Sequence, residues 1–193
     1  MYHKNWKAEI LTIPNLLSLF RLILIPVYVR LYLNAAEPRQ FHIAGGILAV
    51  SCLTDAIDGK IARRFHMIST VGKVLDPLAD KLTQFALILC LAVKHPALNP
   101  VLVLFAMKEI FQLSLGIFYF QRGKMLPGAL QAGKICTAVL FISLTLLVFF
   151  PDIHSDLVRT IAITDGVFLI ISLISYIFAY FGSQTKVQDI NAE

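Results

Sequence analysis

Charged residues and cysteines are scarce in this chain of 193 residues. Lysine, arginine, aspartate and glutamate together make up 15% of it, and only 12 residues are acidic. Soluble domains carry about 25% charged residues, so the composition argues against a water-soluble domain and excludes a disordered chain. The three cysteines, Cys52, Cys90 and Cys136, are odd in number and lack metal-ligand spacing. We expect them to be small buried hydrophobic residues rather than a disulfide framework.

Hydrophobic sequence is what the chain has in abundance, at 58% of its residues. A run of about 18 or more apolar residues is long enough to cross a membrane as a helix. No repeat or linker divides the chain, so we expect a single domain over residues 1–193. The sequence predicts an all-α integral-membrane bundle of six transmembrane helices, with spans near 11–33, 41–58, 77–94, 97–120, 130–150 and 160–181.

The lysines and arginines between the spans indicate how the chain lies in the cell membrane. Six spans place both termini on one side, and most of these basic residues fall on that side. Cytoplasmic loops keep such an excess, so we expect cytoplasmic N- and C-termini. Residues 1–10 mix Tyr2 and Trp6 with Lys4 and Lys7, which predicts a short interfacial amphipathic helix. The apolar run that follows is too long for a signal peptide, so we expect no cleaved leader.

Some charged residues lie within or at the ends of the spans, where a charge is costly unless it is paired or functional. The basic ones are Arg21, Arg30, Lys81, Lys108 and Lys134. Glu109 is expected to pair with Lys108 on another helix, or with Arg21. For Asp165, in the last span, we expect a structural hydrogen bond rather than a catalytic role.

Four aspartates gather where the second span ends and the third begins. Asp55 and Asp58 are three residues apart, and Asp76 and Asp80 are four apart. Each pair would project from one face of a helix, so two antiparallel helices could aim all four carboxylates at one point. Unpaired, they would repel one another and suffer desolvation. Hard divalent cations such as Mg²⁺ or Mn²⁺ remove that penalty and usually bridge to phosphate, which predicts phosphate chemistry at the cytoplasmic face.

Simpler interpretations exist for parts of this stretch. The Asp76-Pro77 pair is typical of a helix N-cap followed by proline at the first helical position. Gly59 is also compatible with a helix end, and Arg63 and Arg64 with the inside excess of positive charge. None of these accounts for Asp80, which would lie a full turn inside an apolar helix.

The same stretch resembles the signature of the CDP-alcohol phosphatidyltransferase family at every signature position. Its pattern is D-x-x-D-G-x-x-A-R over 55–63, then eight residues, then G-x-x-x-D-x-x-x-D over 72–80. The resemblance implies a six-span enzyme that transfers a phosphatidyl group from a CDP-linked lipid to an alcohol and releases CMP. It also implies two divalent ions, Mg²⁺ or Mn²⁺, held on the diphosphate, and a homodimer.

Carried over residue by residue, the resemblance makes Asp55, Asp58 and Asp76 metal ligands. Asp80 becomes the base that deprotonates the acceptor hydroxyl and a further metal contact. Binding of the CDP-lipid then falls to Asn15, Thr54, Asp58, Gly59, Ala62, Arg63, Ser69, Thr70 and Gly72. Asn15 is also compatible with a helix cap.

Two further patterns concern the acceptor alcohol. Residues 14–21 and Gly133-Lys134-x-x-Thr137 resemble the first and fifth spans of the phosphatidylglycerophosphate synthase and cardiolipin synthase branches. Lys134 is also compatible with a snorkelling end charge. Candidates for acceptor binding are Arg64, Lys108, Arg122, Lys134 and Thr137.

The fourth span carries Lys108-Glu109 where the glycerophosphate-using branch typically has Arg-Glu, and residues 110–118 hold no arginine. Arginine binds phosphate in a bidentate fork that lysine cannot reproduce. This departure makes phosphatidylglycerol, the acceptor of CMP-forming cardiolipin synthases, the alternative acceptor. Other basic residues could compensate for the missing arginine, so the resemblance still favours CDP-diacylglycerol and sn-glycerol 3-phosphate as substrates, giving phosphatidylglycerophosphate and CMP.

Two other classes of protein compete with an enzyme. A cation transporter could use the aspartates to bind a permeating ion, and a non-catalytic scaffold would be favoured by loss of a motif residue. The small residues at fixed offsets and the complete motif argue against both. Nucleic acid is not an expected partner, because the basic residues flank spans and have no recognition module beside them.

Overall fold

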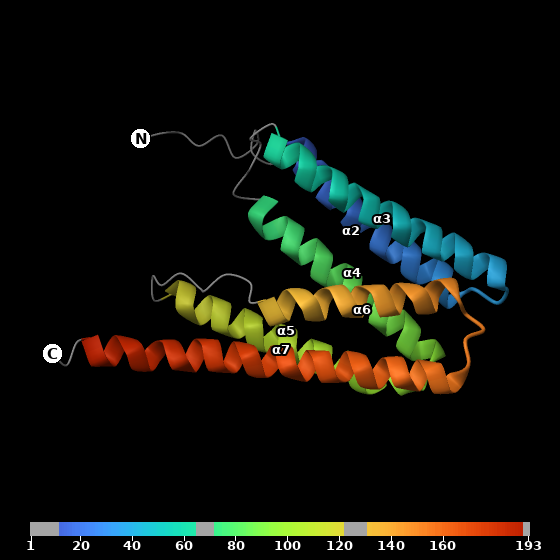
Figure 1. Cartoon of the computed structure of the whole chain (residues 1–193). Helices are drawn as coiled ribbons and strands as arrows, with labels where there is room; N and C mark the ends of the chain where they lie inside the picture. The colour runs from blue at the N-terminus through green and yellow to red at the C-terminus, as the bar shows by residue number, and fades with distance from the viewer. Residues whose placement is uncertain (1–11, 65–71, 122–130, 191–193) are drawn as a thin grey trace. The chain divides into compact units, whose positions relative to one another are not determined.

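The computed structural model describes residues 12–64, 72–121 and 131–190 (Figure 1). No β-strand occurs in these ranges, so the predicted all-α class is confirmed for them. For residues 55–64 the structure describes the helix backbone alone, and the expected interfacial helix over 1–10 lies outside the described residues. The helices are α2 Ile13–Leu33, α3 Pro38–Arg64, α4 Gly72–Lys94, the 3₁₀ turn η1 Pro96–Leu98, α5 Asn99–Gln121, α6 Gln131–Phe149 and α7 Ser155–Ile190.

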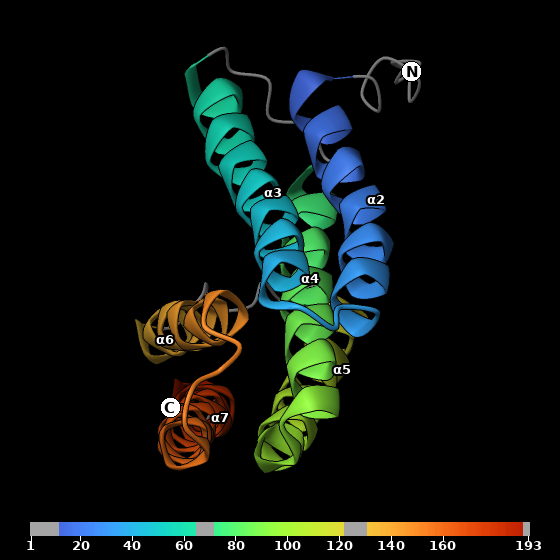
Figure 2. The same ribbon diagram turned by 90° about the vertical axis from the view of Figure 1, so that its right-hand side faces the viewer.

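A short polar turn joins α2 to α3. The carbonyl of Arg30 accepts both the side-chain amide of Asn34 at 2.7 Å and the backbone N–H of Asn34 at 3.3 Å, so Asn34 caps the end of α2. The side-chain oxygen of Gln40 accepts from the backbone N–H groups of Ala36 and Glu37 at 2.7 and 3.3 Å. The turn therefore closes a helical hairpin, and α2 and α3 lie side by side in both views (Figure 2).

Two compact units make up the chain, and the first contains α2, α3, α4 through Val93 and residues Leu147–Asp152. Its buried side chains include Tyr28 and Tyr32, whose ring centroids are 5.7 Å apart. Phe149 packs on Gly45, where an added Cβ would lie 3.0 Å from the ring. The carbonyl oxygen of Phe149 lies 3.1 Å from a ring nitrogen of His42. The absence of a side chain at Gly45 thus lets the end of α6 rest against α3.

The second unit contains η1, α5, α6 to Leu146 and α7. Helices α5 and α7 pack against each other, and η1 contacts both. Gly133 lies beneath Tyr176 of α7, because an added Cβ there would be 2.6 Å from the tyrosine hydroxyl. The Tyr176 ring stacks on that of Tyr180 at a centroid distance of 6.1 Å. The absence of a side chain at Gly133 therefore lets Tyr176 of α7 approach the backbone of α6 closely.

Four described segments are long and apolar enough to cross a membrane: Asn15–Leu33, Pro96–Phe118, Gln131–Phe149 and Ser155–Tyr180. Apolar side chains are exposed along them, as on α5 at Val103, Met107, Ile110, Leu113 and Ile117. Their spacing of three or four residues forms one stripe on the helix, and soluble proteins rarely expose such a continuous apolar surface. The chain is a multi-pass membrane protein. The count of six spans stays a prediction.

Candidate active site

Helix α4 carries two of the four aspartates, Asp76 and Asp80. The helix begins at Gly72, which is buried, so Asp76 lies inside the helix and Pro77 follows it in the helix interior. The interpretation of Asp76 as an N-cap is therefore wrong, and the helix begins earlier than the span predicted from residue 77. The spacing of four residues places both carboxylates on the same side of α4.

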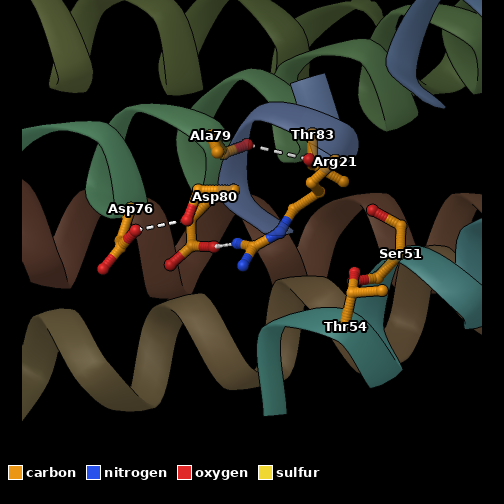
Figure 3. A network of polar contacts seen from close by, with 8 residues as sticks. Arg21, Ser51, Thr54, Asp76, Ala79, Asp80 and Thr83 are labelled. Atoms are coloured by element: carbon orange, nitrogen blue, oxygen red, sulfur yellow. Dashed lines mark hydrogen bonds and ion pairs between the residues drawn. The ribbon is translucent and has the colours of Figure 1, made fainter. Parts of the chain in front are cut away.

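Arg21 of α2 forms an ion pair with Asp80 of α4 through its Nη1 and the Oδ1 of the aspartate (Figure 3). The arginine is 2% exposed, whereas the Asp80 side chain is 51% exposed. A buried guanidinium is costly without a hydrogen-bonded anionic partner, which Asp80 supplies. Because half of the Asp80 surface remains open, the same carboxylate can also meet a ligand.

Ser18, one turn before Arg21 on α2, donates a hydrogen bond to Asp76 with 2.5 Å between the oxygens. Asn15, Ser18 and Arg21 are spaced by three residues, so they share one face of α2, and all three are buried. A polar face inside an apolar helix is therefore turned toward α4. The sequence predicted Asn15 as a binding residue and Arg21 as a paired or functional charge, but it did not predict Asp80 as the partner of Arg21 or any role for Ser18. The spacing of these polar residues in an apolar span was the signal that could have found them.

Helix α3 approaches the same region with Ser51 and Thr54 (Figure 3). The Thr54 hydroxyl donates to the carbonyl of Ser51 at 2.6 Å. On α4, the Thr83 hydroxyl donates to the carbonyl of Ala79 at 2.8 Å. Figure 3 thus shows that α2, α3 and α4 of the first unit all contribute polar side chains to the region around Arg21 and the two aspartates.

The remaining candidates for the metal and CDP-lipid sites lie beyond what the structure describes of the side chains. The α3 backbone is helical through residue 64, which supports the prediction that Asp55 and Asp58 share a face. The structure describes only the backbone of six candidates at the end of α3: Asp55, Asp58, Gly59, Ala62, Arg63 and Arg64. Ser69, Thr70 and Arg122 lie outside the described residues.

Asp76 and Asp80 fit a hard divalent cation by the chemistry of their donor atoms. Carboxylate oxygens are the ligands that Mg²⁺ and Mn²⁺ prefer. Within the ranges that the structure describes, no third acidic, histidine or cysteine side chain joins them to form a metal-binding group. The two aspartates are therefore one half of the predicted donor set, and α3 carries the other half.

Lys108, a candidate for acceptor binding, lies in the second unit and is 3% exposed. Its ammonium group donates to Glu109 at 2.7 Å and to Gln112 at 3.0 Å. Lys108 is confirmed as a partner of Glu109, but the two residues pair within α5 and not between helices as expected. An anionic ligand that binds Lys108 would therefore have to compete with Glu109.

The other two acceptor candidates in the second unit lie near the start of α6. Lys134 is exposed, and the Thr137 hydroxyl donates to the carbonyl of Gly133 at 2.9 Å. The Thr137 hydroxyl thus has a partner in its own helix.

Comparison with known proteins gives a consistent result. The family model for CDP-alcohol phosphatidyltransferase matches residues 11–179. A CDP-diacylglycerol--glycerol-3-phosphate 3-phosphatidyltransferase of Aquifex aeolicus is 30% identical over 86% of this chain and 94% of its own length. A protein of the same name from Shigella flexneri is 33% identical over 76% of this chain and 81% of its own length. A CMP-forming cardiolipin synthase of Streptomyces coelicolor is 43% identical, but over only 38% of this chain and 35% of its own length.

The family match spans most of the chain and includes both halves of the aspartate pattern. The structure agrees with it in the helical backbone around the first pair of aspartates and in the common face of the second pair. The chain belongs to the CDP-alcohol phosphatidyltransferase family, as an integral-membrane transferase of phospholipid biosynthesis.

Proposed function

We propose that this protein transfers the phosphatidyl group of CDP-diacylglycerol to sn-glycerol 3-phosphate, giving phosphatidylglycerophosphate and CMP. The observation that carries the proposal is the pair Asp76 and Asp80 on one side of α4, with Asp80 held by Arg21 and still half exposed. A base must remain within reach of its substrate, and the open half of Asp80 meets that condition.

In the proposed reaction Asp80 takes the proton of the acceptor hydroxyl. The acceptor oxygen then forms a bond to the phosphorus that bears the diacylglycerol, and the bond from that phosphorus to the oxygen of CMP breaks. CMP leaves with the electron pair of the broken bond. The proton later passes from Asp80 to solvent, so the enzyme returns to its starting state.

The metal ligands in this proposal are Asp55, Asp58 and Asp76, with Asp80 as a further contact. Two ions, Mg²⁺ or Mn²⁺, would neutralise charge on the diphosphate and on the leaving CMP when bound. The helical backbone of α3 and α4 supports this set, because each pair of aspartates has helical spacing on its own helix.

The CDP-lipid would lie along the same two helices and the α2 face beside them. The candidates are Asn15, Thr54, Asp58, Gly59, Ala62, Arg63, Ser69, Thr70 and Gly72. Among those with described side chains, Asn15 is buried on the α2 face that carries Ser18 and Arg21. Binding through Asn15 therefore depends on the polar surface that α2 presents to α4.

Acceptor binding is proposed for Arg64, Lys108, Arg122, Lys134 and Thr137. The glycerol 3-phosphate assignment is supported by the Aquifex and Shigella relatives, which align over most of their lengths. The alternative acceptor, phosphatidylglycerol, is favoured by the Streptomyces relative and by the engagement of Lys108 with Glu109. A lipid acceptor with its phosphate already esterified presents less negative charge and needs fewer cationic donors.

The protein would cross the membrane six times, with α3 and α4 as the second and third spans. On α4, Leu78, Leu82, Phe85, Leu89 and Val93 form an exposed apolar stripe, as a lipid-facing helix requires. In this arrangement residues 1–10 lie at the interface, both termini and the active site face the cytoplasm, and the protein forms a homodimer of single-domain chains.

A substrate panel tests the proposed function. Purified protein in detergent receives CDP-diacylglycerol, Mg²⁺ and one acceptor: glycerol 3-phosphate, phosphatidylglycerol, inositol phosphate or serine. Of the four acceptors, we expect only glycerol 3-phosphate to give CMP and phosphatidylglycerophosphate. Chelation of the metal should abolish CMP release. Product with phosphatidylglycerol instead would support the cardiolipin synthase alternative, and cation flux in liposomes without CMP would contradict transferase activity.

A further inference from the structure

Tyr176 of α7 holds its hydroxyl against the start of α6. The residue is 8% exposed, and its ring stacks on that of Tyr180. A Cβ added at Gly133 would lie 2.6 Å from the tyrosine hydroxyl, so this hydroxyl reaches the α6 backbone. Among the described residues, no hydrogen bond to the Tyr176 hydroxyl is present. A polar side chain that is buried without a partner costs free energy, which a ligand that bonds to it removes.

Helix α5 turns a polar pair toward the same part of the second unit. Lys108, Gln112 and Leu115 are spaced by four and three residues, so they share one face of α5. Leu115 packs against the cluster formed by Tyr176 and Tyr180, which directs this face toward α7. The Lys108 ammonium donates to Gln112 on the same face.

Helix α6 connects the tyrosine with the lysine. Cys136 follows Gly133 by three residues and therefore lies on the same face of α6, one turn further along. Its buried thiol lies within electrostatic reach of Lys108. The Tyr176 hydroxyl and the Lys108 ammonium thus border the same interior of the second unit, about one turn of α6 apart.

We propose that Tyr176 determines acceptor specificity by donating a hydrogen bond from its hydroxyl to the phosphate of glycerol 3-phosphate, beside Lys108. The inference rests on the proposed function and deepens it, because it adds a phosphate contact that the sequence patterns do not assign. Hydrogen bonds to charged acceptors are the strong ones, and a phenol supplies one without a second buried charge. Lys108 already donates to Glu109, whereas the Tyr176 hydroxyl has no such competitor among the described residues.

The proposed site suits a water-soluble phosphate. In the six-span arrangement, the start of α6 and the last turns of the span Ser155–Tyr180 lie on the cytoplasmic side, which glycerol 3-phosphate reaches from water. Glycine at position 133 leaves the space that the Tyr176 hydroxyl occupies.

Steady-state kinetics of Tyr176→Phe in detergent test the proposal. We expect KM for glycerol 3-phosphate to rise about tenfold, because one hydrogen bond to a charged group is lost. The kcat and the KM for CDP-diacylglycerol should stay within about threefold of the unaltered protein. Inorganic phosphate, used as a competitive inhibitor at constant free Mg²⁺, should lose affinity by the same factor as glycerol 3-phosphate. Tyr180→Phe is the matched control, because it removes the hydroxyl of the neighbouring stacked ring and should leave KM unchanged.

A second variant reaches the same hydroxyl from the other side. The added Cβ of Gly133→Ala would displace it, so KM for glycerol 3-phosphate should rise in this variant as well. In Gly133→Ala/Tyr176→Phe the two effects should not add, because both act through one hydroxyl. If Tyr176→Phe does not fold, as judged by gel filtration, Gly133→Ala decides the question.

The outcomes separate this proposal from the proposed function. Unchanged KM for glycerol 3-phosphate in Tyr176→Phe would overturn the role of Tyr176 and leave the transferase reaction standing. An equal rise in Tyr180→Phe would do the same, since it would show an effect of packing. A higher KM with unchanged inhibition by phosphate would overturn the contact with the phosphate group. No CMP from the unaltered protein with glycerol 3-phosphate would overturn the proposed function and this proposal with it.

Discussion

The hydroxyl of Ser143 on α6 lies 2.9 and 2.7 Å from the two carboxylate oxygens of Asp165 on α7. Asp165 is fully buried, and 22 residues separate it from its partner. The hydroxyl donates to the carboxylate, which a buried acidic side chain requires. The expected structural hydrogen bond of Asp165 is confirmed, and it joins two helices of the second unit.

Replacement of Asp165 by asparagine should leave the protein folded and active. The amide oxygen still accepts from Ser143, and the cost of a buried charge disappears, so we expect an unchanged or higher melting temperature in detergent. Ser143→Ala removes the donor and should cost about 1–3 kcal/mol of stability. Thermal unfolding measures both changes. Loss of CMP release in well-folded Asp165→Asn would instead indicate a catalytic role.

Gly133→Ala should destabilise the contact between α6 and α7. Its Cβ would lie 2.6 Å from the hydroxyl of buried Tyr176, so a neighbouring group must move, and overpacking of this kind costs about 1–3 kcal/mol. Gly46→Ala is the matched control on α3, because nothing lies within 4 Å of the added Cβ there.

Alanine in place of Gly46 should stabilise the helix by about 0.5–1 kcal/mol, because alanine has the higher helix propensity. Melting temperatures in one detergent compare the two variants. Tyr176→Phe should restore part of the stability lost in Gly133→Ala. Equal melting temperatures for both glycine variants would contradict the close packing of α6 on α7.

Asp80→Asn should nearly abolish turnover. The amide of asparagine cannot take the proton from the hydroxyl of the acceptor alcohol at neutral pH. We therefore expect kcat to fall about 10²- to 10⁴-fold. Release of CMP from CDP-diacylglycerol with saturating acceptor measures the effect. Asp156→Asn is the control, because that side chain is 88% exposed at the start of α7 and faces His154. Full turnover by folded Asp80→Asn would show that the base is another group.

Cysteine labelling in intact cells tests the six-span topology. In a background with Cys52, Cys90 and Cys136 replaced by alanine, we introduce one cysteine at Glu37, in the turn between α2 and α3, or at His66, between α3 and α4. With α3 and α4 both crossing the membrane, a membrane-impermeant maleimide should label Glu37→Cys from outside and His66→Cys only after permeabilisation. Labelling of both Glu37→Cys and His66→Cys in intact cells would show that α3 does not cross the membrane and would contradict six spans, whereas labelling of His66→Cys alone would reverse the orientation.

Local patterns in the sequence predicted the helices well, because each apolar run needs only its own residues to form a hydrogen-bonded segment. The structure places helices over all the runs within the described ranges. The boundary near Asp76 was wrong because aspartate before proline is a common helix start, and the sequence contains no sign that α4 begins one turn earlier. The N-cap pattern is a local preference, and the actual start depends on residues that precede it.

The candidate site was predicted only in part for a different reason. The spacing of Asp76 and Asp80 is a property of one helix, and it placed them on a common face as predicted. Ser18 and Arg21 lie 58 and 59 residues away from the aspartates they contact. No spacing rule connects residues so far apart, so their partnership was not readable from one sequence.

The sequence by itself determined the membrane-helical class, the family and the aspartates that carry its pattern, because hydrophobicity and helical periodicity act over a few turns of one chain segment. Only the tertiary structure decided which polar group of α2 contacts which aspartate of α4. Side-chain pairing between helices depends on how α2 packs against α4, and that packing gave Asp76 a neutral hydroxyl and Asp80 a buried guanidinium.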